Sequence, residues 1–267
     1  MIVMLDINDK RRFCFSLFKK DRIITHTASQ DDISVMNIKY TRYHKAINMK
    51  KIEALCSGST DTLLCHEGII PDKARLMRFC DNTLSIKLME NFIFSILSEF
   101  DPDNLRICVC DPSAQFYELT EKLFSYSRSI TVATEMQHFY SCRADEIAAS
   151  FGGQLTMADN ASMLPACDIL IHPGIVTSAL PEHKFVFTAY PPMTKTANNV
   201  IYKYLISVPE SYRKIIPENA DINYFLCALY SICGKTELGL ITPEKCLSVS
   251  GALSKNYIVN KLSESSQ

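Results

Sequence analysis

The feature that most constrains this chain is an alternation of short apolar runs and longer amphipathic segments between residues 105 and 189. Residues 105–110 and 129–134 have the apolar composition of buried strands. Apolar residues then recur at helical spacing over 116–123 and 136–151. Because strands separated by helices pair in parallel through right-handed crossovers, the pattern predicts an α/β fold.

Three further strands are predicted in the same region, at residues 154–157, 168–172 and 184–189. Gly152 and Gly153 end the helix that precedes the first of them, as glycine commonly does at a helix C-terminus. Proline follows each of the other two strands and would stop them. We therefore expect one parallel sheet at the centre of the molecule.

The chain divides into three predicted parts. Residues 1–103 read as an α+β N-terminal domain, 104–190 as the α/β domain, and 191–267 as a helical C-terminal segment that packs on it. The run Asp101-Pro102 disfavours regular structure and marks the first boundary.

The flanking parts have weaker patterns than the centre. The expected N-terminal strands cover residues 1–7, 13–18 and 23–28, and the expected helices cover 43–55, 72–80 and 84–100. In the C-terminal segment, Asp221 is a good N-cap for a helix that Gly234 ends, and Thr242-Pro243 is expected to begin another.

Composition excludes several classes of protein. The chain has 267 residues, of which 47% are hydrophobic, so it can bury a large core. A net charge of −1 without basic blocks argues against nucleic-acid binding. The most apolar stretch, residues 84–100, is interrupted by charged residues and reads as a buried helix rather than a membrane span.

The cysteines favour a reducing compartment. There are 11 of them, none in a C-x-x-C arrangement, and most lie in apolar surroundings. Small buried thiols in a cytoplasmic protein account for this pattern, and no spacing fits a standard zinc site. Together with an N-terminus that lacks the pattern of a secretory signal, this predicts a cytoplasmic protein without a bound metal.

Residues 105–189 resemble a Rossmann-type NAD(P)-binding domain of the kind found in many dehydrogenases. The likeness lies in the strand 107–110, in Glu135 after the second strand, in the helix end at 148–153, and in the acidic residue and apolar strand of 165–171. The resemblance implies a Rossmann-like parallel sheet. It also implies that the first strand-to-helix turn would hold a pyrophosphate on a G-x-G-x-x-G loop.

That turn contains no glycine here. It reads Asp-Pro-Ser-Ala-Gln-Phe from Asp111 onward, so side chains stand where the phosphates need bare backbone. Pro112 removes one N–H donor, and Asp111 at the predicted N-cap brings its own carboxylate to the positive end of the helix. Each effect is worth about 1 kcal/mol and all oppose a bound anion. We expect no pyrophosphate in the usual pose.

Four residues are the candidate ligand-binding set: Asp111, Ser113, Glu135 and His172. Each ends or follows a predicted strand of the sheet, at the edge where open α/β proteins bind ligands. Glu135 stands at the spacing of a ribose-binding acid, although an acid near a helix start is more often a surface residue. His172 could serve as a general base, although a strand-end histidine bonded to backbone is the commoner case.

Three functions remain open from the sequence. The favoured one is a small-ligand-binding or regulatory module, with a small molecule or a protein as partner, and without classical dinucleotide binding. The alternative is an NAD(P)-dependent oxidoreductase with an atypical cofactor loop and His172 near the nicotinamide. A metal-assisted enzyme centred on Asp111 is disfavoured, because such enzymes place a second carboxylate where this chain has Ser113. No cofactor is expected under the favoured reading.

Overall fold

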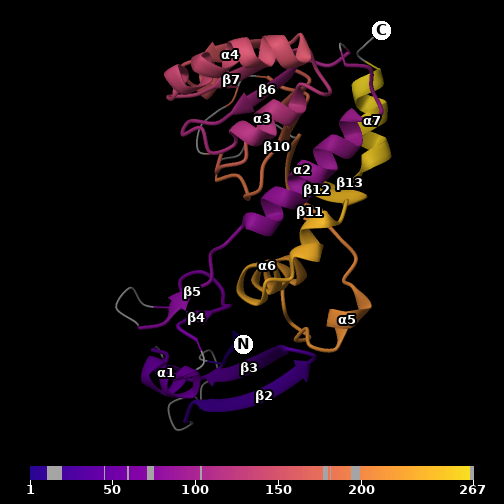
Figure 1. Ribbon diagram of the computed structural model, residues 1–267. Helices are drawn as coiled ribbons and strands as arrows, with labels where there is room; N and C mark the ends of the chain where they lie inside the picture. Colours follow the sequence, from indigo (N-terminus) through magenta and orange to yellow (C-terminus); the bar gives the residue numbers. More distant parts are fainter. Residues whose placement is uncertain are drawn as a thin grey trace. The chain divides into compact units, whose positions relative to one another are not determined.

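The computed structural model describes residues 1–10, 20–44, 46–58, 60–70, 75–102, 104–176, 180, 182–193 and 199–264. The chain forms two compact units, each built from two separate segments (Figure 1). The first unit comprises Met1–Leu84 and Ser207–Leu238, and the second comprises Ser85–Ile206 and Gly239–Gln267.

The second unit contains the predicted parallel sheet. Its parallel strands are β6 (Ile107–Cys110), β7 (Ser129–Ala133), β8 (Gln154–Ala158), β9 (Ile169–Ile171), β10 (Phe185–Phe187) and β11 (Val200–Leu205). They lie in the order β8-β7-β6-β9-β10-β11. Numbered along the chain this is 3-2-1-4-5-6, the order of the doubly wound dinucleotide-binding fold. The α/β class and the Rossmann-like sheet are confirmed.

Two antiparallel strands extend this sheet beyond β11. They are β12 (Lys245–Ser248) and β13 (Gly251–Ser254). The segment after residue 190 therefore contains strands as well as the helices that were expected. The predicted helix start at Thr242-Pro243 is wrong, because the following residues extend to pair with β11 instead.

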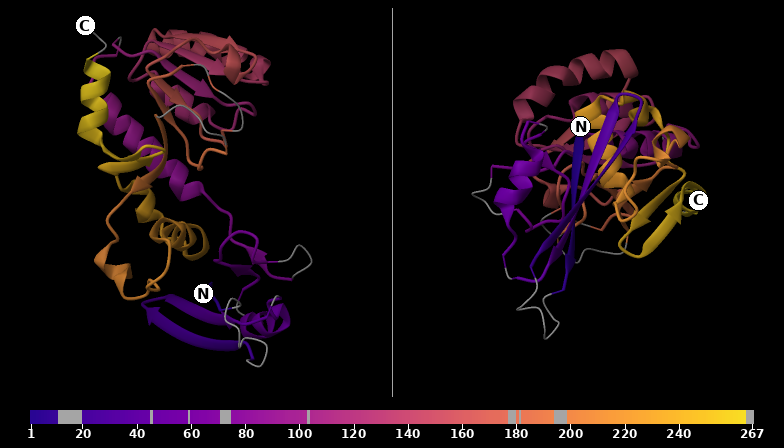
Figure 2. Two further views of the ribbon diagram at one scale, coloured as in Figure 1. Left: turned by 180° about the vertical axis from the view of Figure 1, so that it is seen from behind. Right: turned by 90° about the horizontal axis from the view of Figure 1, so that it is seen from below.

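Helices cover the sheet unevenly. Helix α3 (Tyr117–Leu123) connects β6 to β7, and α4 (Gln137–Phe151) connects β7 to β8. Among the described residues between β9 and β10, and between β10 and β11, there is no helix. Helix α2 (Thr83–Leu97) packs Phe92 against rings from β10 and β11, and α7 (Lys255–Ser263) runs beside it (Figures 1 and 2).

The packing of α2 explains why most of this helix belongs to the second unit, which begins at Ser85. Phe92 is fully buried, and its ring centroid lies 6.3 Å from that of Phe187 and 5.7 Å from that of Tyr204. Lys255 at the start of α7 bonds Glu99 just after α2. The helix therefore belongs to the sheet that it covers, although it precedes the sheet in sequence.

The first unit is built on a three-stranded sheet in the order β1-β3-β2. Its elements are β1 (Ile2–Asp9), β2 (Arg22–Gln30), β3 (Ile33–Arg42), α1 (Met49–Cys56), β4 (Thr62–Leu63), β5 (Met77–Arg78), α5 (Glu210–Arg213) and α6 (Ile222–Cys233). Ile52 and Cys56 of α1 pack with Val3 and Leu5 of β1 in one apolar cluster. This confirms a mixed α+β segment.

Two expectations for this unit need correction. The predicted helix over 72–80 is wrong in its described part, where β5 pairs in parallel with β4. Strand β3 was not predicted, although its side chains alternate between buried and less buried positions over much of its length. The strand expected at 13–18 lies outside the described residues.

Local signals at helix ends are confirmed in both units. Asp221 caps α6 by accepting a hydrogen bond from Tyr224 N, and Gly234 follows the helix with φ 66°. Gly152 ends α4 in the same left-handed conformation, with φ 63°. Glycine adopts this conformation without the steric cost that a Cβ imposes.

Candidate functional site

The carboxyl edge of the parallel sheet begins with Asp111, directly after β6. Its side chain is fully buried. Its carboxylate accepts the backbone N–H of Gln115 and of Phe116, each at 2.9 Å, and the Tyr140 hydroxyl at 2.6 Å. Both oxygens of the carboxylate are thus occupied by donors of this chain.

These donors are the groups that would face an anion in a phosphate-binding turn. The expectation that Asp111 caps α3 directly is wrong in register, because α3 begins at Tyr117 and its N-cap is Phe116. The carboxylate instead bonds the two N–H groups that immediately precede the helix. These N–H groups are therefore bonded to a side chain of the protein itself.

The backbone of the turn is strained in one place. Ala114 has φ 57°, one of two positive values among the described non-glycine residues. An L-residue in this conformation costs about 1 kcal/mol relative to glycine. The turn thus keeps a backbone shape suited to glycine while carrying a side chain, which is consistent with the prediction that it is an altered phosphate loop.

Ser113 and Glu135 are both exposed at this edge. The backbone N–H of Glu135 donates to the carbonyl of Pro112 at 3.1 Å, which joins the turn after β7 to the turn after β6. The side chain of Glu135 does not cap α4, whose N-cap is Met136 without a side-chain cap bond. Glu135 is therefore placed at the carboxyl edge beside the altered turn.

His172 lies half-buried after β9, the strand next to β6. Its Nδ1 is 3.2 Å from the carbonyl oxygen of Gly174, which also accepts the Thr188 hydroxyl at 2.8 Å. Because a carbonyl only accepts, Nδ1 carries the proton and Nε2 is the acceptor. Burial lowers the pKa of His172, so the ring is neutral at pH 7.

The structure places these four residues at one edge of one sheet, after the three adjacent strands β9, β6 and β7. Among the described contacts, no hydrogen bond joins the side chains of Ser113, Glu135 and His172 to one another. The edge therefore offers one buried acid that is already satisfied, two exposed polar groups, and a neutral imidazole.

A second constellation lies at the opposite, amino-terminal edge of the same sheet. A pocket of about 460 Å³ is lined there by residues that include Arg106, Cys167, His183, Lys184, Phe185 and Tyr257. Sequence reasoning missed this set. Cys167 and His183 form no recognised motif, because they come from segments that only strand pairing brings together.

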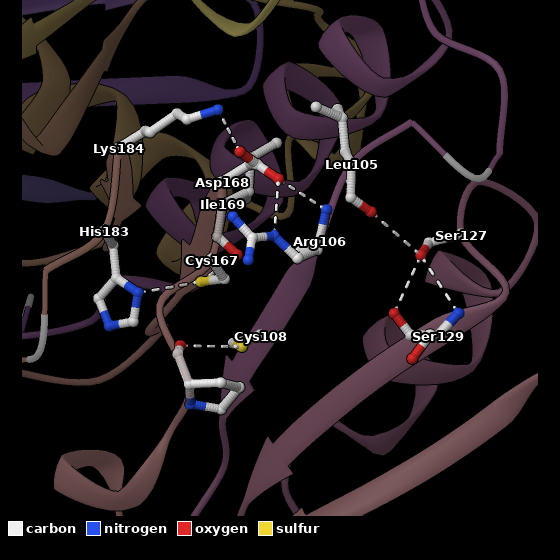
Figure 3. Close-up of polar contacts among 11 residues, drawn as sticks. Leu105, Arg106, Cys108, Ser127, Ser129, Cys167, Asp168, Ile169, His183 and Lys184 are labelled. Atoms are coloured by element: carbon white, nitrogen blue, oxygen red, sulfur yellow. Dashed lines mark hydrogen bonds and ion pairs between the residues drawn. The ribbon is translucent and has the colours of Figure 1, made fainter. Parts of the chain in front are cut away.

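Asp168 organises the charges beside this pocket (Figure 3). Its carboxylate pairs with the Lys184 ammonium and accepts the backbone N–H of Arg106 at 2.9 Å, with the Arg106 guanidinium Nε at 3.6 Å. Burial alone would raise the pKa of Asp168, but the bonds from Lys184 and Arg106 outweigh it, so the pKa is lowered.

We expect Asp168→Asn to reduce the free energy of unfolding by about 1–3 kcal/mol at pH 7, since it weakens the bonds of a buried carboxylate to Lys184 and to the Arg106 N–H. The folded pKa lies below the unfolded value of about 3.9. The contribution is therefore complete above that value and is lost as the pH falls through the folded pKa. Urea titrations from pH 7 down to pH 3 measure it. Exposed Asp145→Asn is the control, and a constant difference between wild type and Asp168→Asn over this range would contradict the expectation.

The described residues contain no group of three or more His, Cys, Asp or Glu side chains placed to hold a metal ion. Within the same part of the chain, no helix has the length and apolar character required to cross a membrane.

No protein-family model matches the sequence, and no curated protein matches it either. Among solved structures, the chain is similar to L-tryptophan dehydrogenase from Nostoc punctiforme, with 10% identity and a TM-score of 0.34 over 86% of this chain and 74% of that one. It is also similar to a shikimate 5-dehydrogenase-like protein, with 13% identity and a TM-score of 0.26 over 58% and 66%. At such scores neither likeness says anything about activity, and the fold assignment rests on the strand order.

Proposed function

We propose that the chain is a Rossmann-like module that binds a small ligand or regulates a partner, without receiving a dinucleotide in the usual pose. The observation that carries the proposal is the Asp111 carboxylate, which accepts the backbone N–H groups of Gln115 and Phe116 in the turn before α3. A pyrophosphate at this turn would have to displace a buried carboxylate that also accepts the Tyr140 hydroxyl. It would also meet like charge at close range.

The favoured ligand position is the carboxyl edge near Ser113, Glu135 and His172. Exposed Ser113 and Glu135 supply a hydroxyl and a carboxylate, and neutral His172 supplies an acceptor nitrogen. Such a set suits a polar, uncharged or cationic small molecule better than an anion, because Asp111 and Glu135 both bring negative charge. The fold adds no information on the ligand's identity.

The second candidate function is an NAD(P)-dependent oxidoreductase with an atypical cofactor loop. The strand order and the position of Glu135 after β7 favour it. In this case His172 Nε2 would accept the proton that leaves a substrate hydroxyl when hydride is transferred. The cofactor would need a pose that avoids the N–H groups bonded to Asp111.

Titration with NADH and NADPH separates the two candidates. We expect wild-type protein to show neither a saturable change in nucleotide fluorescence nor a thermal shift up to millimolar nucleotide. Saturable micromolar binding that is lost in Glu135→Ala would replace the first proposal with the second. Exposed Glu118→Ala on α3 is the matched control for the loss of one carboxylate. A thermal-shift panel of nucleotides, S-adenosylmethionine and divalent metals then searches for the ligand.

A further inference from the structure

A histidine and a cysteine lie together on the exposed face of α4. His138 and Cys142 are four residues apart in this helix, so they lie on consecutive turns of the same face. Both side chains are exposed, whereas Tyr140 and Ile147 are buried on the other side of the helix. Neither His138 nor Cys142 belongs to the set on which the proposed function rests.

The two side chains are already in contact. Cys142 Sγ lies 3.7 Å from His138 Nε2 and 4.0 Å from His138 Nδ1. A tetrahedral zinc ion binds sulfur at about 2.3 Å and imidazole nitrogen at about 2.0–2.1 Å, which separates the two donor atoms by about 3.6 Å. The observed separation therefore matches that of two ligands on one ion. A rotation of the exposed imidazole about its Cβ–Cγ bond would aim one nitrogen at the ion.

The helix fixes this spacing before any ion binds. Both residues lie within α4, so their backbone positions are set by the helix, and binding costs mainly the rotation of two side chains. A thiolate and an imidazole are ligands that zinc and similar ions prefer, whereas Mg²⁺ and Ca²⁺ prefer oxygen. The pair therefore suits a thiophilic divalent cation.

The charges near the pair also favour a cation. Asp145 is exposed three residues after Cys142, one turn along the helix. The neighbouring basic residue, Arg143, pairs with Glu146 at 4.0 Å, and its guanidinium lies 4.7 Å from the ring centroid of Tyr117. The positive charge beside the pair is thus balanced, and Asp145 adds a negative one.

We propose that His138 and Cys142 form a two-ligand chelate for Zn²⁺ or a similar thiophilic divalent cation. Because the described residues contain no group of three or more such ligands, water completes the tetrahedron. The Cys142 thiol gives up its proton to the buffer when the ion binds, and the imidazole binds in its neutral form. The expectation of a protein without a bound metal rested on the standard zinc patterns, and a two-ligand pair on one helix is outside them.

Metal titration tests the proposal. The starting protein carries Cys80→Ser, because Cys80 is the other exposed cysteine of the described residues. We expect equilibrium dialysis to show saturable binding of Zn²⁺ at micromolar concentrations, with one ion per chain. Titration with Co²⁺ should give the absorption band of a thiolate-to-cobalt charge transfer, which reports the sulfur ligand directly. Absence of saturable zinc binding in this range, or of the cobalt band, would overturn the proposal.

Single substitutions assign the ligands. Cys142→Ser and His138→Ala should each weaken zinc binding by more than about tenfold, since changes outside the ligands alone cost about 10–100-fold. Exposed His26→Ala on β2 is the control and should leave zinc binding unchanged. Equal zinc affinities in the starting protein and in either ligand variant would refute the role of that side chain.

A relocated thiol tests the spacing itself. Cys142→Ser combined with Ser150→Cys keeps one thiol and His138 on exposed positions of α4, but separates them by about 18 Å along the helix axis. This variant should bind zinc no more tightly than Cys142→Ser alone. The affinity of the starting protein in this variant would overturn the chelate. Because every substituted position on α4 is exposed, the variants should keep the circular dichroism spectrum of the starting protein.

Discussion

Replacing Asp111 with alanine is expected to lower the free energy of unfolding by roughly 3–5 kcal/mol. The substitution removes a fully buried carboxylate that satisfies Gln115 N, Phe116 N and the Tyr140 hydroxyl. Bonds to a charged acceptor are each worth about 1.5–3 kcal/mol, and buried donors left without a partner add a further penalty. Urea denaturation followed by circular dichroism measures the loss.

Two further variants show that the effect belongs to this carboxylate. Ser113→Ala changes an exposed residue of the same turn and is expected to stay within about 0.5 kcal/mol of wild type. A double-mutant cycle of Asp111→Asn with Tyr140→Phe should give a coupling energy of about 1–2 kcal/mol, because the two groups are bonded at 2.6 Å. A loss below about 1 kcal/mol in Asp111→Ala would mean that water replaces the carboxylate at little cost. The turn would then be open to an external anion.

Replacing Phe92 with alanine is expected to cost about 3–5 kcal/mol, because it leaves a cavity between α2 and the sheet. The ring is fully buried and contacts the rings of Phe187 and Tyr204. Those residues lie on β10 and β11, and no described helix connects these two strands. Thermal and urea denaturation should show the loss.

The control for this prediction is Met136→Ala, which truncates an apolar residue that is 48% exposed. We expect it to change stability by less than about 0.5 kcal/mol. Phe92→Leu should recover part of the loss, since it restores apolar volume without the ring contacts. Equal stabilities for Phe92→Ala and Met136→Ala would show that α2 does not hold the sheet.

The central elements could be predicted because their signals are local. Apolar runs and helical periodicity over residues 105–189 identify strands β6 to β10 and the two crossover helices, but not the parallel strand β11. Asp221, Gly234 and Gly152 act on backbone groups within a few residues of themselves, so their roles follow from position alone. An acid in a glycine-free turn can also be read from the sequence at Asp111. Which backbone N–H groups its carboxylate bonds could not be predicted from the sequence.

Elements that depend on distant partners were missed or misassigned. The residues of β5 and β12 become strands because they pair with β4 and with β11, and no periodicity within a few residues reveals a partner elsewhere in the chain. Residues 207–238 are likewise placed by contacts with a distant part of the chain. They join the first unit, where Tyr224 bonds the carbonyl of Phe79.

The sequence by itself therefore determined the α/β class, strands β6 to β10, the helix ends at Asp221, Gly234 and Gly152, and the lack of glycine in the first strand-to-helix turn, since each depends on neighbouring residues. Only the tertiary structure decided the strand order, the attachment of α2 to the sheet, and the meeting of Cys167 and His183 at one edge. Inter-strand hydrogen bonding and burial set these features. Both depend on which distant segments become neighbours, and a linear pattern of residues does not contain that information.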